Sequence, residues 1–503
     1  MVPSGTRSCL GAVALTLALS LTACTVGPDY RPEAAPTPTR YKELKGWKLA
    51  APSDGLDRGD WWALYHDRKL DFLIEQVEIS NQTVAAAAAS YEQARAIIRE
   101  AQAALFPVLS AAYNATRSFS GAAIVGVPGF GGEFVTGAYR NTYVPQLSGT
   151  WDLDVWGRIR RQIESTTSAA QASAADLDNA KLSAQAALAT AYFNLRAADS
   201  LRDLLERTVV FYKESQRITQ DKVNAGCCVA PLVPVSPADL ALAKALVETT
   251  QAQAINVGVQ RAKYEHAIAM LIGRPPAELT IAPHLLTGRI PKIPIMVPST
   301  LLERRPDIAD AERTMQQQNA LIGVAEAAFF PDISLSGALQ AIGSNPLPFS
   351  VANEVWSLGA TGTEVLFKGG LRAAQVDAAR AAYWQSVASY RQTALTAFQQ
   401  VEDQLAAVRL LTRQLVVARK ATVDAREAVR VYRDQYQAGT VDLTTVVTGE
   451  ALLLADQEAE LTVRQDLFLA SVNLIEALGG GWNANLLPTK NELVKGISLL
   501  PQL

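Results

Sequence analysis

The sequence predicts a mixed α and β protein in which long helical hairpins and two pairs of strands arise from an internal duplication. Residues 103–107 (AALFP) have a counterpart at residues 327–331 (AAFFP), each lying between an Ala-rich helical pattern and an alternating one. Apolar residues then recur at heptad spacing over very long stretches. The order helix, strand pair, long helix, tight turn and returning helix follows both times. The duplication therefore predicts a fold built from two copies of the same arrangement of helices and strands.

The first 23 residues have the pattern of a signal peptide. Arg7 gives a weakly positive start, and the apolar run at 10–20 is too short to cross a bilayer as a permanent helix. Small residues precede Cys24, so we predict cleavage before it and acylation of its thiol, as in bacterial lipoproteins. The alternative is an ordinary signal peptide that contains a cysteine. An extended tether should follow, because it is rich in proline: Pro28, Pro32, Pro36 and Pro38.

Composition excludes several classes of protein. The net charge of −3 mixes both signs, which argues against nucleic acid as a partner. Four cysteines do not make a disulfide scaffold, although the adjacent Cys227 and Cys228 could form a strained disulfide or stay free. No apolar run of about twenty residues follows the signal, so a mature chain that crosses a membrane must do so as strands.

Two pairs of segments alternate between apolar and polar residues. The first pair covers residues 109–116 and 139–154, and the second pair covers 333–340 and 355–367, with connecting loops at 121–137 and 343–348. Strands between lipid and a wet lumen need this period, but a half-buried soluble sheet shows it too. Four strands cannot close a barrel alone, and an open edge is not tolerated in lipid. Either several chains share one barrel or the sheet is soluble.

The longest helices should pack along heptad seams. The helix of the first repeat should run over about residues 159–223, and Gly226 and Gly439 should mark the two turns into the returning helices. The residues of the first predicted seam are Leu201, Leu204, Thr208, Phe211, Ser215 and Ile218. Those of the second are Val408, Leu411, Leu415, Ala418, Thr422, Ala425, Val429, Tyr432 and Tyr436.

Several motifs resemble those of one family. Residues 297–308 (VPSTLLERRPDI) resemble the signature of the outer-membrane factor family, the TolC-like channels of tripartite efflux systems, and residues 329–331 (FFP) continue it. Residues 24–30 (CTVGPDY) look like the start of its lipoprotein branch, which serves resistance-nodulation-division multidrug pumps. Residues 61–62 (WW) and 271–273 (LIG) are similar to further landmarks. The resemblance covers nearly the whole mature chain.

This resemblance implies a homotrimer in the bacterial outer membrane, lipid-anchored through Cys24, with a large periplasmic extension. Each chain would give four transmembrane strands to a shared twelve-stranded barrel, and its helices would form a coiled-coil tunnel. The implied partners are a periplasmic adaptor (membrane fusion) protein, an inner-membrane resistance-nodulation-division pump and outer-membrane lipid. Residues 304–307 (RRPD) would be structural, because Pro beside Asp suits a helix start.

The expected organisation has six parts. They are a signal peptide (1–23), a lipid-anchored tether (24–60), the first repeat (61–273), a Pro-rich linker (274–298), the second repeat (299–480) and a tail (481–503).

By the same resemblance, the periplasmic helix tips should form an iris-like gate. Its candidate residues are Tyr436, Asp442, Thr445 and Thr448. Relatives often place aspartates where this chain has the two threonines, which puts strong cation selectivity at those levels in doubt. Asp442 is equally suited to cap the returning helix, and Tyr436 to simple packing or to a hydrogen bond across helices.

No enzyme chemistry is predicted. The three histidines, His66, His266 and His284, are scattered without metal-ligand spacing, and apart from the lipid on Cys24 no cofactor is expected. The predicted function is passive conduction of small molecules, such as drugs or toxic compounds, from an adaptor and pump to the exterior. The alternatives are a channel for protein export and a periplasmic coiled-coil lipoprotein without a pore.

Overall fold

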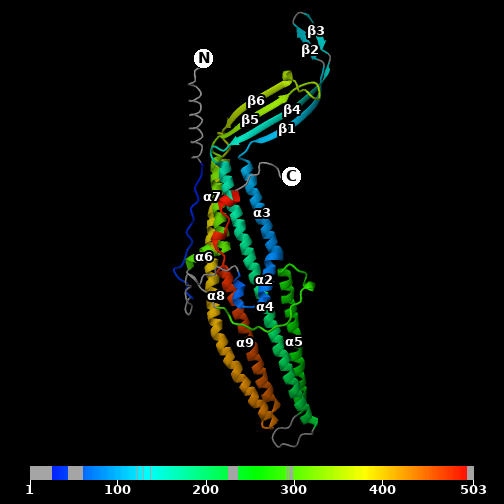
Figure 1. Cartoon of the computed structure of the whole chain (residues 1–503), viewed down its shortest axis with the longest axis vertical. Helices are drawn as coiled ribbons and strands as arrows, with labels where there is room; N and C mark the ends of the chain where they lie inside the picture. The colour runs from blue at the N-terminus through cyan, green and yellow to red at the C-terminus, as the bar shows by residue number, and fades with distance from the viewer. Residues whose placement is uncertain are drawn as a thin grey trace.

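The computed structural model describes residues 25–43, 60–121, 123–127, 130–135, 137–224, 236–291, 293 and 298–494. The molecule is elongated, with strands at one end and two helical hairpins converging at the other (Figure 1). In chain order the elements are η2 (Trp61–Tyr65), α2 (Arg68–Ser80), α3 (Gln82–Ala103), β1 (Val108–Ser120), β2 (Ala123–Val127), β3 (Phe130–Val135), β4 (Ala138–Leu153), α4 (Arg158–Asn224), α5 (Pro237–Leu271), η3 (Pro276–Glu278), α6 (Pro298–Arg304), α7 (Pro306–Ala327), β5 (Asp332–Ala341), η4 (Val351–Asn353), β6 (Glu354–Thr363), α8 (Leu371–Gln437), α9 (Leu443–Ala477), η5 (Ala484–Leu486) and α10 (Lys490–Val494).

The predicted duplication is confirmed by the lengths and order of the elements. Helices α3 and α7 each have 22 residues, α4 and α8 each have 67, and α5 and α9 each have 35. Each repeat thus runs helix, strand pair, long helix and returning helix. Among the helices that the structure describes, none combines the length and apolar composition that a membrane-crossing helix needs.

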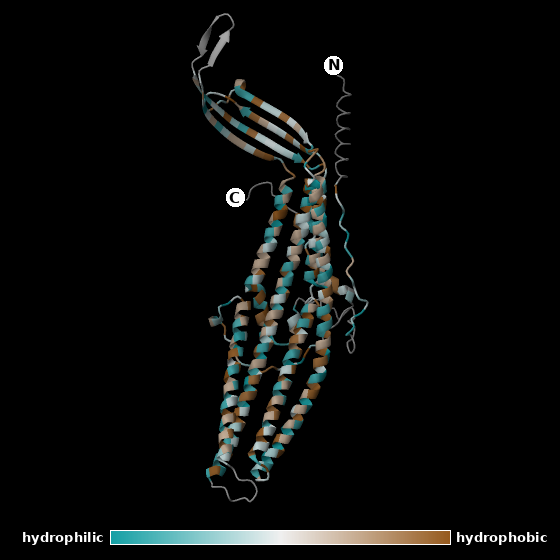
Figure 2. Cartoon of the chain, turned by 180° about the vertical axis from the view of Figure 1, so that it is seen from behind, coloured by the Kyte–Doolittle hydropathy of each residue, from teal (hydrophilic) through white to brown (hydrophobic). Residues whose placement is uncertain are grey.

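The strands form one antiparallel sheet in the order β1-β4-β5-β6. Its register aligns Ala111, Leu147, Leu339 and Trp356 across all four strands, so apolar side chains share one face. Polar side chains share the other: Ser110 lies opposite Ser148, and Thr150 opposite Ser336. Apolar and polar residues accordingly alternate along these strands in Figure 2. The sheet has two faces of opposite character, as the sequence predicts.

Two strand predictions need correction. Strand β6 ends at Thr363 rather than continuing to residue 367, because Arg372 of α8 bonds Glu364 and the carbonyl of Val365 and draws the chain out of the sheet. The segment 121–137, expected as a loop, contains the strands β2 and β3, which pair as a ribbon beyond the main sheet (Figure 1).

Around the middle of the bundle, an aromatic cluster forms the core. Tyr65 contacts Phe193 and Phe468, with ring centroids 4.9 and 6.3 Å apart, and its hydroxyl bonds Ser471 over 2.8 Å. Trp61 stacks edge-on against Tyr65. Residues from η2, α4 and α9 thus meet in one buried cluster, which fixes the two hairpins relative to each other at this level.

Of the two predicted helix seams, the second is confirmed, whereas the first holds at Thr208, Leu201 and Ile218 and fails at Phe211. Val408, Thr422, Val429 and Tyr436 are buried along α8. Phe211 of α4 is 49% exposed, and Leu205, Val209 and Tyr212 are buried beside Thr208. Residues 209–212 (VVFY) are four successive apolar or aromatic residues, so spacing alone does not decide which of them face the neighbouring helices.

Candidate functional site

The tips of the two hairpins are joined through Tyr436. Its side chain is 5% exposed, and its hydroxyl shares a hydrogen bond of 3.3 Å with Thr219 Oγ1 of α4. Lys222 of α4 places its ammonium 3.6 Å from the centroid of the tyrosine ring and donates to the Tyr436 carbonyl over 3.0 Å. Burial raises the pKa of Tyr436. We name this set the Tyr436 contact; it connects α8 of the second hairpin to α4 of the first.

A second set of contacts lies one helical turn farther from the tip. Arg433 of α8 donates to Glu450 of α9 over 2.7 and 2.9 Å, and its guanidinium lies 4.1 Å from the ring centroid of Phe211 on α4. Glu450 is 5% exposed, and its second carboxylate oxygen has no hydrogen-bond partner among the described residues. Burial raises the pKa of Glu450, although the neighbouring guanidinium acts in the opposite direction. We name this set the Arg433 contact.

The polar residues of the second turn cap the returning helix. Asp442 precedes α9 and accepts from the backbone N–H of Thr445 over 2.9 Å and from its hydroxyl over 2.6 Å. These bonds lower the pKa of the Asp442 carboxyl. The Thr448 hydroxyl bonds the Thr444 carbonyl, and Gly439 makes the turn with φ of +74°. Local hydrogen bonds therefore occupy all three predicted aperture side chains.

Some predicted residues lie outside the described part of the chain. These are Cys24, Gly226, Cys227 and Cys228. In the described residues, no group of three or more His, Cys, Asp or Glu side chains could hold a metal ion.

Just after Cys24, the chain lies along the helices as an extended strap, defined here as residues 25–43. Arg161 of α4 donates to the carbonyls of Val26 and Gly27 over 3.1 Å each and pairs with Asp29 at 2.9 Å. A methyl group on Gly27 would lie 2.3 Å from Cα of Gly323 in α7, so only glycine allows this approach. Further contacts join Pro28 to Asn319, Tyr30 to Glu312, Glu33 to Arg391 and Glu43 to Arg409.

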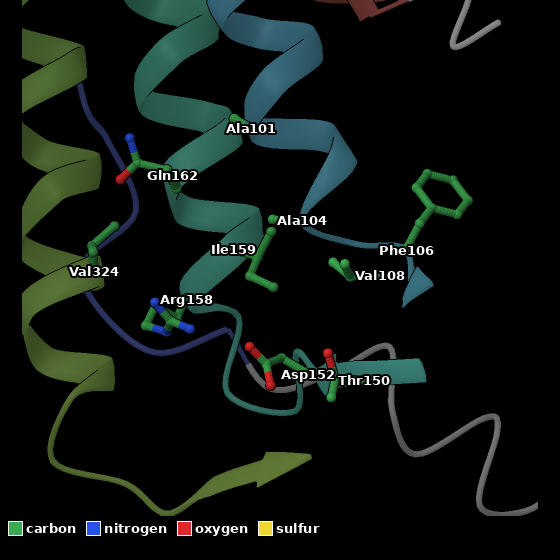
Figure 3. Close-up of a pocket in the computed structure, with 10 residues that line it drawn as sticks. All are labelled: Ala101, Ala104, Phe106, Val108, Thr150, Asp152, Arg158, Ile159, Gln162 and Val324. Atoms are coloured by element: carbon green, nitrogen blue, oxygen red, sulfur yellow. The ribbon is translucent and has the colours of Figure 1, made fainter. Parts of the chain in front are cut away.

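A pocket of about 300 Å³ lies where the strands meet the helices (Figure 3). We name it the junction pocket. Its apolar wall includes Ala104 and Phe106, from the α3–β1 connection, and its polar rim includes Asp152 of β4 and Arg158 of α4. Val108 and Thr150 also line it and lie opposite each other in the register. The pocket thus opens on the polar face of the sheet.

The RRPD segment is structural, as the resemblance implies. Arg305 holds Asp307 with two hydrogen bonds of 2.6 and 2.9 Å and donates to the Ala477 carbonyl at the end of α9. Pro306 starts α7. The segment therefore ties the start of one helix to the end of another.

One turn into α7, Asp310 is a source of pH dependence. Burial, together with the nearby carboxylates of Asp176 and Asp307, raises its pKa to about 6. A raised carboxyl pKa destabilises the fold as pH rises from about 4 through about 6, because the ionised form is disfavoured only when folded. Asp310→Asn should therefore stabilise the protein by about 1–2 kcal/mol at pH 7 and leave it unchanged near pH 4.

Thermal unfolding followed by circular dichroism across this pH range checks the expectation. Asp434→Asn is the matched control, since Asp434 is exposed on α8 and pairs with Arg430. Equal stabilisation by both variants, or the same gain at both pH values, would contradict the assignment to Asp310.

Known proteins similar to this chain match it over nearly its full length. A sequence profile described as outer membrane efflux protein matches residues 73–274 and 297–480. The antibiotic efflux pump outer membrane protein ArpC of Pseudomonas putida is 29% identical over 475 residues, covering 93% of this chain and 95% of its own. The cation efflux system protein CusC of Escherichia coli O6:H1 is 28% identical over 472 residues, covering 93% and 97%. The structure of the outer-membrane channel OprN superimposes with a TM-score of 0.81 at 30% identity, covering 91% and 100%.

Proposed function

The chain belongs to the outer membrane efflux protein family, and from this premise we propose that it is the outer-membrane channel of a tripartite efflux system. It is not an enzyme, since this family works by conduction. The relatives' names include antibiotic and cation efflux, so the cargo proposed here is small molecules or ions. A periplasmic adaptor and an inner-membrane pump would deliver the cargo and supply the energy.

The two-faced sheet is the observation that carries this proposal. Strands β1 and β6 are its outermost strands, and neither has a second partner among the described strands. Its apolar face exposes large side chains, including Tyr139, Leu147 and Leu358 at 71, 51 and 81%. An open edge and an exposed apolar face are both unfavourable in an isolated chain. Three copies that pair β6 with β1 would satisfy every edge and turn the apolar face outward to lipid.

The position of the strap supports anchoring in the outer membrane. Thr25 lies against Gly157, at the junction between sheet and helices, and Val26 bonds the Trp156 carbonyl over 3.1 Å. A lipid on the preceding Cys24 would therefore enter the membrane beside the strands. The hairpins then extend away from the membrane, toward the proposed partners in the periplasm.

The gate is proposed to lie at the hairpin tips, where the Tyr436 and Arg433 contacts hold the second hairpin against the first. Breaking both sets would let the second hairpin swing outward about the packed middle of the bundle. Partner binding must then favour the splayed tips over the joined ones, since a ligand shifts an equilibrium only through differential affinity. Asp442 is proposed to contribute charge near the aperture while it caps α9.

Single-channel recording of the purified protein in a planar bilayer tests the proposal, with stoichiometry first determined by native mass spectrometry. We expect discrete conductance steps from a trimer, small at rest because the tips are joined. A folded monomer without conductance would exclude the channel and favour a coiled-coil lipoprotein. A silent trimer would instead be examined with the tip variant discussed below.

A further inference from the structure

An exposed apolar turn follows β6. Leu366 and Phe367 are 93% and 87% exposed, yet the turn that presents them is braced. Arg372, in the first turn of α8, bonds Glu364 at 2.6 Å and the Val365 carbonyl at 3.0 Å. Gly369 and Gly370 then bend the chain into α8 with φ of +58° and +81°. An exposed aromatic side chain on a braced turn indicates a surface that is covered in the assembled protein.

The opposite edge of the sheet carries a matching hollow. The junction pocket combines an apolar wall, including Ala101, Ala104 and Phe106, with a volume of about 300 Å³ that has room for one aromatic side chain. It lies beside the start of β1, as Figure 3 shows for Phe106 and Val108. The turn after β6 and this pocket thus lie at the two free edges of the sheet.

Strand direction brings the two features together when a second copy is added. Strand β1 starts, and β6 ends, at the helical end of the sheet (Figure 1). Antiparallel pairing of β6 with β1 of a second copy therefore sets the turn of one chain beside the pocket of the next. Thr361 and Thr363 lie on the polar face, opposite Ser334 and Asp332, which is the face on which the pocket opens. The chain leaves the sheet after Thr363, so the turn that carries Phe367 lies at the helical end of this edge.

We infer that Phe367 inserts into the junction pocket of a second copy of this chain and interlocks the two sheet edges. This inference rests on the trimer of the proposed function. The charges are compatible with it: Lys368 follows the aromatic residue, the rim of the pocket carries Asp152 as well as Arg158, and neither Lys368 nor Asp152 has an ion pair among the described residues. Lys368 and Asp152 are both exposed in the single chain, and in the assembly they would lie close enough to attract each other.

Thiol cross-linking tests the insertion in cells that produce the full chain. In a background with Cys227 and Cys228 replaced by serine, Ala104→Cys is combined with Phe367→Cys and treated with a short bis-maleimide. We expect covalent dimers and trimers on denaturing gels, formed at least about tenfold faster than in the control pair Ala104→Cys with Leu366→Cys. The control residue is adjacent and similarly exposed, so the comparison tests whether Phe367 in particular enters the pocket.

The outcomes separate the inference from the proposed function. Equal cross-linking by both pairs, or none in a trimer verified by native mass spectrometry, would overturn the insertion and leave the channel intact. A monomer would overturn both. If lipid covers the side chain instead, the fluorescence of Phe367→Trp will be quenched by brominated phospholipid, whereas an inserted side chain will be shielded.

Charge reversal gives a second, independent measurement. Asp152→Lys and Lys368→Asp should each lower the temperature at which the trimer dissociates in sodium dodecyl sulfate. The double variant should recover most of the loss, since it restores opposite signs with the positions exchanged. Additive losses in the double variant would show that these two residues do not meet.

Discussion

Tyr436→Lys is expected to raise the conductance of the resting channel about tenfold or more. The substitution places a second ammonium beside Lys222 in a site where the tyrosine is 5% exposed, and removes both the ring beneath that ammonium and the bond to Thr219. A buried, unpaired charge costs several kcal/mol only while the tips are joined. A penalty of about 3 kcal/mol in the closed state changes the ratio of closed to open channels about a hundredfold.

The matched control is Tyr436→Phe, which keeps the ring for Lys222 and loses only the bond to Thr219. That bond contributes about 1 kcal/mol, so conductance should rise only slightly. Both variants are recorded as single channels in planar bilayers after trimer formation is verified. Resting conductance that is the same in Tyr436→Lys as in the unaltered protein would exclude the Tyr436 contact from the gate.

The second large effect is expected on stability, from Gly479→Ala. Gly479 follows α9 with φ of +90°, and a Cβ there would lie 1.8 Å from the Arg304 carbonyl oxygen. The left-handed backbone costs alanine about 1–2 kcal/mol, and relieving the clash requires α9 to move away from the RRPD segment. We therefore expect a loss of about 3–5 kcal/mol, enough to lower the yield of folded trimer sharply.

Gly258→Ala is expected to have the opposite effect on stability. Gly258 lies inside α5, has ordinary helical geometry, and a Cβ there meets nothing within 4 Å. Alanine should stabilise that helix by up to about 1 kcal/mol. Unfolding of both variants in detergent, followed by circular dichroism, measures the difference. Tolerance of Gly479→Ala would mean that the junction between α9 and the RRPD segment is not tightly constrained.

The sequence predicted the periodic parts of the fold well. Alternation located both strand pairs, and heptad spacing located the two long helices, because each pattern repeats over many residues. The end of β6 and the β2–β3 ribbon were missed. The end of β6 depends on the contact of Arg372 with Glu364. The β2–β3 ribbon forms in a Gly- and Pro-rich segment whose sequence shows no strand periodicity.

The contacts of the candidate site were harder to predict from the sequence than the helices and strands. Tyr436 was identified, but its partners Thr219 and Lys222 lie in the other repeat, and their approach depends on how two hairpins pack. The Arg433 contact was missed for the same reason, since Phe211 was assigned to a buried seam. Capping by Asp442 was one of two alternatives drawn from the sequence, and the structure shows the cap. It was predictable because the partner, Thr445, is only three residues away. Short-range chemistry was predictable, and contacts between repeats were not.

The strap has a consequence for the order in which the chain matures. Tyr30, Glu33 and Glu43 contact residues 282, 358 and 366 positions later in the chain. These residues are synthesised first, yet their docking surface is complete only when α7 and α8 have packed against α4. Contacts over such separations close late, since the loop between them must first lose its freedom. A strap docked on α4, α7 and α8 therefore indicates that both repeats have folded. A protease that cleaves only the undocked strap would degrade the molecules whose folding is incomplete.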